Sequence, residues 1–286
     1  MQMTSETTIP DRSIGAILID SGKLSIKDVE QILRLQKEGG LRFGDAALEL
    51  GLLAHTDIQH ALSHQYDYPY LLRSDESVSD TLVAAYNPFS PQVEALRTLR
   101  SQLMLRRFTG DANSKMLSVV SPSSQEGRSY LAANLAIVFS QLGERTLLID
   151  ADMRNPCQHQ LFKLENRNGF SSVLANRNDR QAVQRVNKFI DLSVLTAGPT
   201  PPNPQELLGR SSLRGLLLEL NEQFDVILVD TPPAADFADA HILTARTGAA
   251  VMLTRKNKSL LELVRQQTES MTRSGIEVVG TVMSDF

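Results

Sequence analysis

The sequence has one cysteine, no tryptophan and only 5% aromatic residues in 286 positions. A single cysteine, Cys157, excludes the internal disulfide framework on which many small secreted proteins depend. The amino terminus lacks a basic segment followed by an apolar run, and no stretch approaches the roughly 20 apolar residues that cross a bilayer. These absences predict a cytoplasmic protein that is peripheral to the inner membrane only through a partner.

The sequence also lacks an excess of positive charge. Lys and Arg total 29 against 33 Asp and Glu, a net charge of −4, so nucleic acid is not an expected partner. The 42% hydrophobic and 22% charged residues are typical of a globular protein. The length favours one large domain and one small one.

The first 70 residues contain an internal repeat, which appears when Gly15 is aligned with Gly44. In each copy a short apolar helix is followed by a glycine, Gly22 or Gly51, and then by a second helix. Ser25 and Asp28 form a predicted capping pair at the start of one of these second helices. The sequence therefore predicts a small all-α domain over residues 1–70.

Residues 71–92 are polar and rich in proline and serine, and we interpret them as a linker. Helical periodicity resumes over residues 94–106. Beyond residue 115, near-continuous apolar strands alternate with helices, which predicts a mostly parallel α/β sheet with helices on both faces. The strands are expected at 116–121, 145–150, 192–195, 226–229, 249–253 and 278–283, and the helices at 129–142, 213–222 and 260–274. The large domain is thus placed at 93–286.

The junction between the first strand and its helix runs from Ser121 to Ser129 and has the position of a phosphate-binding loop. A helix amino terminus presents free N–H groups and the positive end of its dipole to a phosphate. The loop departs from the pattern G-x-x-x-x-G-K-[ST] at Pro122, in the first glycine position, and at Arg128, in the lysine position. Alone, this motif is a weak indication of nucleotide binding.

Carboxylates follow two of the apolar strands. Asp150 and Asp152 follow one, and Asp230 ends another. Carboxylates are costly to bury unless they are paired or bind a metal. Each could simply cap a turn, but the phosphate loop and these two carboxylate junctions in order, where ligands of parallel sheets bind, favour a nucleotide site.

This ordered series resembles the bacterial tyrosine kinases, within the MinD and ParA class of P-loop ATPases, from about Pro91 to Phe286. The similarity includes the altered Walker A loop, Asp150 to Arg154 as Walker A′, Gly198 to Leu208, and Asp230 to Pro233 as Walker B. Within that family it is most similar to chain-length determinant tyrosine kinases of exopolysaccharide clusters. The resemblance implies ATP and Mg²⁺ as cofactors and a membrane chain-length regulator, a polysaccharide copolymerase, that supplies an activating cytoplasmic segment.

The resemblance also implies residue roles. Asp150 is the expected base for a tyrosine hydroxyl, and Arg128 and Asp152 are further expected catalytic residues. Mg²⁺ is expected at Ser129, Asp152 and Asp230. The E-x-x-R-x-x-R segment Glu94, Arg97 and Arg100 is associated with subunit contacts, so a homo-oligomer is expected. The expected nucleotide-binding residues are Ser124, Gln125, Glu126, Gly127, Arg128, Ser129 and Tyr130.

Two departures leave a second interpretation open, a non-catalytic ATP-binding switch or scaffold for polysaccharide export. A guanidinium at position 128 is wider than an ammonium and donates in a fixed fork. No tyrosine-rich tail precedes Phe286, although Tyr66, Tyr68 and Tyr70 offer alternative acceptors that we interpret mainly as packing residues.

The second copy of the amino-terminal repeat resembles the amino-terminal domain of type II secretion and pilus ATPases, some of which bind cyclic di-GMP. Arg42, Gly44, Gly51 and Gln65 carry that similarity. The first copy has Ser13 where the arginine is expected, so half of the arginine contacts are compromised. We favour a docking module, with cyclic di-GMP binding as the alternative.

Overall fold

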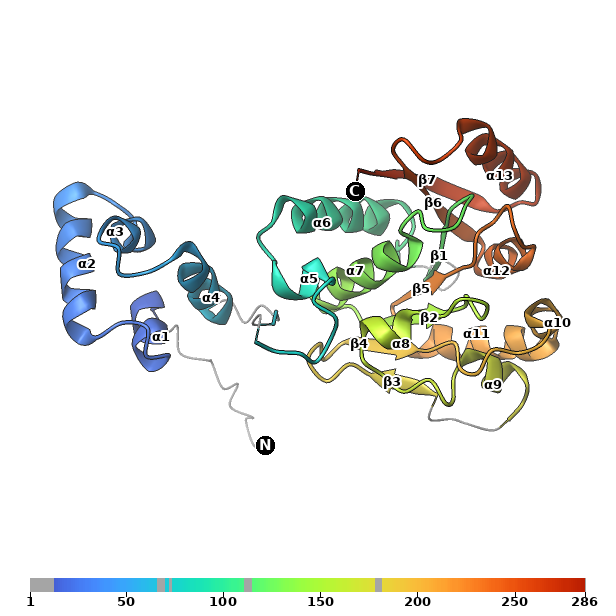
Figure 1. Cartoon of the computed structure of the whole chain (residues 1–286), viewed down its shortest axis with the longest axis horizontal. Helices are drawn as coiled ribbons and strands as arrows, with labels where there is room; N and C mark the ends of the chain where they lie inside the picture. The colour runs from blue at the N-terminus through green and yellow to red at the C-terminus, as the bar shows by residue number, and fades with distance from the viewer. Residues whose placement is uncertain (1–12, 66–69, 72–73, 111–114, 178–181, 286) are drawn as a thin grey trace, which may run out of the picture. The chain divides into compact units, whose positions relative to one another are not determined.

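The computed structural model describes residues 13–65, 70–71, 74–110, 115–177 and 182–285. The chain divides into two compact units, Met1–Pro69 and Tyr70–Phe286, which are coloured in sequence order in Figure 1. In the described ranges no helix is both long and apolar enough to cross a membrane.

The first unit is all-α, and its helices follow the repeat. Ser25 and Asp28 form the expected capping box, in which each residue bonds to the backbone of the other. Gly22 and Gly51 stand at equivalent turns with φ of 70° and 66°, a left-handed conformation that glycine adopts at no steric cost. The helices are α1 (Ile14–Asp20), α2 (Ile26–Gly39), α3 (Phe43–Glu49) and α4 (His55–Gln65).

The core of the first unit is small and aliphatic, and it brings the helices close together. Ile32, Ala46 and Ala61 are fully buried in it. Gly44 lies so near Ile58 that an added Cβ would be 3.2 Å from the Ile58 side chain. Close packing of helices therefore accounts for this glycine of the repeat.

The second unit contains a seven-stranded sheet in the order β3-β4-β2-β5-β1-β6-β7 within the described residues. All pairings are parallel except that of the edge strand β3 with β4, so the predicted fold class is confirmed. The strands are β1 (Met116–Val120), β2 (Thr146–Asp150), β3 (Val183–Arg185), β4 (Leu192–Leu195), β5 (Val226–Asp230), β6 (Ala249–Arg255) and β7 (Glu277–Ser284).

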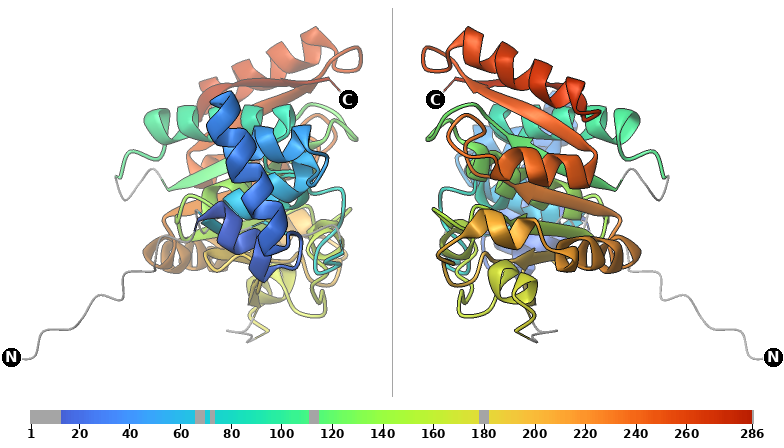
Figure 2. Two further views of the ribbon diagram at one scale, coloured as in Figure 1. Left: turned by 90° about the vertical axis from the view of Figure 1, so that its left-hand side faces the viewer. Right: turned by 90° about the vertical axis from the view of Figure 1, so that its right-hand side faces the viewer.

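Helices cover both faces of this sheet, as Figures 1 and 2 show. Alternate strand residues enter separate cores, for example Leu148 on one face and Leu147 on the other. The first face carries α5 (Val83–Tyr86), α6 (Pro91–Arg106), α7 (Arg128–Ser140) and α8 (Gln158–Leu161). The second carries α9 (Phe170–Leu174), α10 (Pro204–Leu208), α11 (Ser211–Gln223), α12 (Asp239–Thr247) and α13 (Leu261–Arg273).

The described part of the segment 71–92 is folded onto the first face, whereas its composition indicated a linker. Val78 and Leu82 are buried in the core beneath α7. The N–H of Ala84 donates to the side-chain oxygen of buried Asn134, at 2.9 Å. The few apolar residues among the prolines and serines are the ones that pack. The average composition of the segment does not reveal them, because polar residues outnumber them.

This packing predicts that Leu82→Ala destabilises the second unit by about 2–5 kcal/mol, because a fully buried leucine is lost and a cavity remains. Leu105→Ala removes the same atoms from a side chain that is 81% exposed, and its effect is expected to stay within about 0.5 kcal/mol. Urea unfolding of both variants measures the difference. If both variants lost the same free energy of unfolding, residues 71–92 would be a linker and not a packed part of the second unit.

Candidate nucleotide site

The parallel sheet places Asp150 and Asp230 side by side. They are the last residues of the neighbouring strands β2 and β5, and they face each other in register. Both are fully buried, and Asp152, just beyond β2, is 4% exposed. The three carboxylates at the ends of these two apolar strands therefore gather at one edge of the sheet.

Each of the two facing carboxylates has one satisfied oxygen and one unsatisfied oxygen. The main-chain N–H groups of Cys157 and Gln158 donate to Oδ2 of Asp150, at 3.1 and 3.0 Å. The side-chain amide of Gln158 donates to Oδ2 of Asp230, at 2.8 Å. Within the described residues, Oδ1 of both aspartates is buried without a hydrogen-bond partner. Buried polar atoms are almost always paired in native proteins, so these two atoms fit a bound cation.

Burial and mutual repulsion change the acidity of this pair. Burial raises the pKa of Asp150 well above its usual range, and the neighbouring charge of Asp230 raises it further. Burial also raises the pKa of Asp230 to about 6, although Arg128 and the Ser129 hydroxyl act in the opposite direction. A divalent cation at the site would favour the ionised forms of both carboxyl groups.

The three residues expected to hold Mg²⁺, Ser129, Asp152 and Asp230, lie at this carboxylate cluster. The Ser129 hydroxyl and the Asp152 charge both act on the pKa of Asp230. No three His, Cys, Asp or Glu side chains in the described ranges form a metal cage by themselves. Mg²⁺ typically takes one or two carboxylates together with substrate phosphates, so the donor set fits a metal held jointly with a nucleotide.

The phosphate loop has a conformation suited to binding an anion. Gly127 precedes α7 with φ of 97°, and the free N–H groups of the first turn follow it. Gln125 also has a positive φ, 58°, which costs a non-glycine residue on the order of 1 kcal/mol. Glu126 is fully buried and accepts from the N–H of Ser123, at 2.8 Å, and from the hydroxyl of Ser259, at 2.5 Å.

Residues at the end of β6 and just after it hold the loop from the other side. The carbonyl of Gln125 accepts from the guanidinium of Arg255, at 3.2 Å, and from the ammonium of Lys258, at 2.9 Å. The sequence analysis missed these two residues and Ser259, as well as Gln158. No local motif marks them, and only the β1–β6 pairing brings the first three to the loop.

Arg128 is buried, 7% exposed, and is engaged by the protein itself. Its Nε donates to the carbonyl of Thr231, at 2.8 Å. Its Nη1 donates to the Ser121 hydroxyl, at 2.6 Å, and to the Ser123 carbonyl, at 2.8 Å. Nη2 is 3.9 Å from Asp152. The guanidinium fork therefore bridges the phosphate loop, the Walker B end and the Walker A′ carboxylate.

The remaining expected nucleotide residues differ in exposure. Ser124 and Gln125 are exposed on the loop, whereas Ser129 and Tyr130 are half-buried in the first turn of α7. Burial raises the pKa of the Tyr130 hydroxyl. Ser129 also accepts from Gln158 through its carbonyl, at 3.0 Å.

The segment expected at a subunit contact lies on α6. Glu94 and Arg97 form an exposed pair, with 3.2 Å between Oε2 and Nη1. Nη1 of Arg100 donates to the carbonyl of Val138, at 2.7 Å, and so joins α6 to α7. One arginine of the segment thus has a structural role within the chain, and a subunit contact stays a prediction.

The residues considered for cyclic di-GMP all lie in the first unit. Arg42 is exposed at the position before α3, and Gln65 ends α4. Gly44 packs on Ile58, and Gly51 occupies a left-handed turn.

Of the three tyrosines considered as acceptors, Tyr66 and Tyr68 lie outside the described residues. Tyr70 packs edge-on against Phe89, with 6.4 Å between ring centroids. That contact agrees with a packing role for Tyr70.

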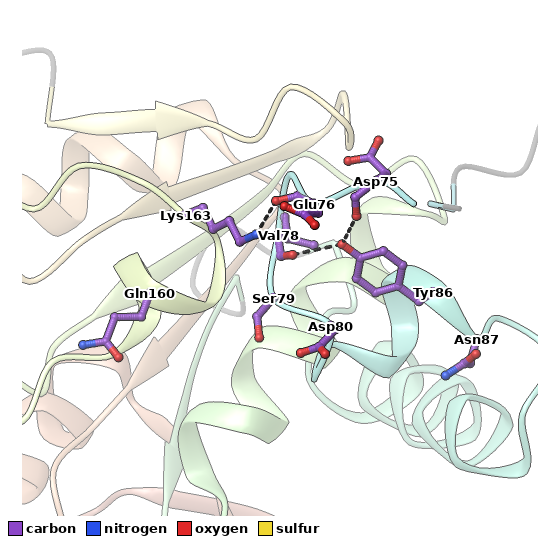
Figure 3. Close-up of a pocket in the computed structure, with 9 residues that line it drawn as sticks. All are labelled: Asp75, Glu76, Val78, Ser79, Asp80, Tyr86, Asn87, Gln160 and Lys163. Carbon is purple, nitrogen blue, oxygen red and sulfur yellow. Dashed lines mark hydrogen bonds between the residues drawn. The ribbon is translucent and has the colours of Figure 1, made fainter. Parts of the chain in front are cut away.

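A separate polar cavity of about 650 Å³ lies between the segment 75–87 and α8. Figure 3 shows that the Lys163 ammonium reaches the carbonyl of Glu76 across it, and that the Tyr86 hydroxyl reaches the carbonyls of Asp75 and Val78. No residue of the expected nucleotide site lines this cavity. The hydrogen bond from Lys163 to Glu76 helps to hold the segment 75–87 against the residues after α8.

Comparisons with known proteins agree with this architecture. Residues 113–285 match the ParA family, described as NUBPL iron-transfer P-loop NTPase. The kinase domain of the Escherichia coli tyrosine kinase ETK superimposes with a TM-score of 0.69 at 28% identity, over 77% of this chain and 85% of that one. The chimerical protein CapA2B2 gives a TM-score of 0.67 at 31% identity, over 79% and 97%.

Sequence relatives point to the same group. The putative tyrosine-protein kinase CapB of Staphylococcus aureus is 34% identical over 197 residues, 69% of this chain and 86% of that protein. The tyrosine-protein kinase YwqD of Bacillus subtilis is 37% identical over 204 residues, 71% and 85%. The tyrosine-protein kinase wzc of Salmonella typhimurium is 33% identical, but this chain spans only 28% of its length.

The sheet order, the strand-end carboxylates and the glycine before α7 therefore define a P-loop NTPase of the ParA class. Within that class, the chain belongs to the bacterial tyrosine-protein kinase family.

The buried carboxylate pair predicts an unusual pH dependence of stability in the metal-free protein. Because the pKa of Asp230 rises to about 6 on folding, the native state binds more protons than the unfolded state between about pH 4 and 6, and stability falls as the pH rises through that window. Asp230→Asn cannot ionise, so we expect it to be more stable than the wild type at pH 8, by on the order of 3 kcal/mol. The gain should disappear near pH 4.

Asp225→Asn is the matched control, because Asp225 precedes the same strand and Arg145 lowers its pKa. This variant should lose stability at pH 8, and its loss should also fade below pH 4. Thermal unfolding in a chelating buffer at several pH values tests both variants. A destabilised Asp230→Asn at pH 8 would contradict the account of the pair.

Proposed function

We propose that the chain is an ATP-binding protein-tyrosine kinase of exopolysaccharide biosynthesis, which regulates chain length or export together with a membrane polysaccharide copolymerase. The observation that carries this proposal is the pair Asp150 and Asp230, buried in register with one unsatisfied oxygen each. Mg²⁺ accounts for Asp230, but a site that only holds a metal and a nucleotide does not need Asp150 as a proton acceptor. A kinase does, because the acceptor hydroxyl must lose its proton.

In this mechanism Ser129, Asp152 and Asp230 would hold Mg²⁺, which neutralises charge on the ATP phosphates when bound. The N–H groups at the start of α7 bind phosphate oxygens. The tyrosine oxygen attacks the terminal phosphorus, the bond from that phosphorus to ADP breaks, and the phenolic proton passes to Asp150. Mg²⁺ in the site would favour the ionised form of Asp150, which is the form that can accept this proton.

An ATP-binding switch without turnover is the second candidate, and the contacts of Arg128 favour it. Its Nε and Nη1 are already committed to Thr231, Ser121 and Ser123. A lysine side chain would be free to follow the phosphates, whereas this fork must break hydrogen bonds to do so. Binding would then control assembly of the export machinery rather than phosphorylation.

The relatives differ in the share of their length that this chain covers. It spans 28% of the tyrosine-protein kinase wzc, 27% of the putative tyrosine-protein kinase EpsB of Ralstonia solanacearum and 86% of CapB. We infer the membrane copolymerase from the resemblance to chain-length determinant kinases.

Kinase activity is tested by incubating the full chain with a peptide from the partner's cytoplasmic segment, Mg²⁺, labelled ATP and a glutamate-tyrosine copolymer. We expect label on tyrosine, reduced about 10²- to 10⁴-fold in Asp150→Asn because the proton acceptor is lost. Asp225→Asn, at the other end of β5, is the matched control and should keep activity. No label from the wild type, with label from Arg128→Lys, would leave the switch as the function of this chain.

We propose docking, rather than cyclic di-GMP binding, for the first unit. Gly44 packs against Ile58 and Gly51 forms a left-handed turn, so both motif glycines have structural roles that need no ligand. Calorimetric titration of the full chain with cyclic di-GMP should therefore give no heat. Heat from the wild type that disappears in Arg42→Ala would replace docking with nucleotide sensing.

A further inference from the structure

Arg154 follows the carboxylates of β2, and its side chain crosses to the residues that follow β5. Its Nε donates to Oδ2 of Asp239, at 2.8 Å, and its Nη2 approaches Oδ1, at 3.4 Å. Asp239, the first residue of α12, is 1% exposed. The guanidinium carbon lies 4.0 Å from the centre of the Phe237 ring. A bidentate ion pair and a cation–π contact thus hold one side chain.

These contacts fix a side chain that would otherwise sample many rotamers. The carboxylate sets the plane of the guanidinium, and the ring covers one of its faces. The Arg154 side chain is still 27% exposed. Its Nη1 makes no hydrogen bond to any residue in the described ranges, so one donor group is held in place and available.

The main chain of Arg154 and the segment that leads to Phe237 both border the nucleotide site. Its main-chain N–H donates to Oδ1 of Asp152, at 3.2 Å. The residues before Phe237 are bonded to the phosphate loop, since the N–H groups of Ala234 and Ala235 donate to the carbonyls of Ser121 and Pro122, each at 3.0 Å. Arg154 therefore spans the two strand-end loops that flank the place of a terminal phosphate.

Arg128 also lies at the site, but it is less accessible than Arg154. Its Nε and Nη1 donate to Thr231, Ser121 and Ser123, and its Nη2 lies 3.9 Å from Asp152. The Arg128 side chain is 7% exposed, whereas that of Arg154 is 27% exposed. Arg154 is therefore better placed to reach a bound phosphoryl group.

We propose that Arg154 contacts the phosphoryl group during its transfer, and that Asp239 and Phe237 are positioning residues that hold it for this contact. The proposal rests on the kinase function above. As the phosphorus leaves ADP for the tyrosine oxygen, charge is spread over its three equatorial oxygens. A guanidinium that is already oriented stabilises this charge without reorganising.

The test measures the affinity of the full chain for fluorescent ADP with Mg²⁺, the partner segment and the copolymer, with and without aluminium fluoride, which imitates a planar phosphoryl group. In the wild type, aluminium fluoride should tighten ADP binding at least about a hundredfold. Arg154→Gln should bind ADP within about threefold of the wild type and lose at least about tenfold of the tightening. Asp239→Asn and Phe237→Leu should lose part of it, and Arg154→Lys should recover only part, because an ammonium cannot pair in two places.

Arg145→Gln is the matched control, since Arg145 precedes β2, pairs with Asp225 and lies at the opposite end of the strand. It should keep both ADP affinity and tightening. Full tightening in Arg154→Gln, or none in the wild type, would overturn the role of Arg154. A wild type that shows the expected Arg154-dependent tightening but labels no tyrosine supports that role and counts against the kinase function alone, whereas a wild type that binds no ADP defeats both.

Discussion

Two carboxylates buried side by side impose the main constraint on the second unit. The register of β2 and β5 places Asp150 against Asp230, and burial alone makes their ionisation costly. Gln158 and Arg128 offset part of that cost, yet one oxygen of each aspartate has no partner in the described part of the chain. The fold therefore gives up stability to keep two carboxylates buried with unpaired oxygens, as functional sites commonly do.

Arg128 stands in the lysine position of the phosphate loop, and it is held by the protein itself. Its hydrogen bonds to Thr231, Ser121 and Ser123 stabilise the loop in a single arrangement. The same bonds reduce its freedom to follow a phosphate. Arg154 is held in a different way, by Asp239 and Phe237 at the edge of the site.

Local patterns in the sequence predicted the regular elements well. Strands such as Leu192–Leu195 are short, mostly apolar runs, and their length together with the flanking turn residues favours a strand over a helix. The capping box at Ser25 and Asp28 could also be predicted, because both partners lie within one turn of the chain. The antiparallel edge strand β3, with only half-buried or exposed residues, carries no such pattern and was not predicted. Composition likewise missed the packing of Val78 and Leu82.

The sequence by itself determined the class of fold and the order of the strand-end motifs, because apolar periodicity and carboxylates at strand ends are local properties of the chain. Tertiary structure alone decided which groups meet around them. Gln158, Ser259 and Asp239 reach the site from separate elements, with no signal at their own positions. Their roles depend on strand order and register, which set distances between residues far apart in the chain. For the same reason, the sequence was enough to recognise Arg128 as a departure from the phosphate-loop pattern. Its hydrogen-bond partners could be found only in the folded protein.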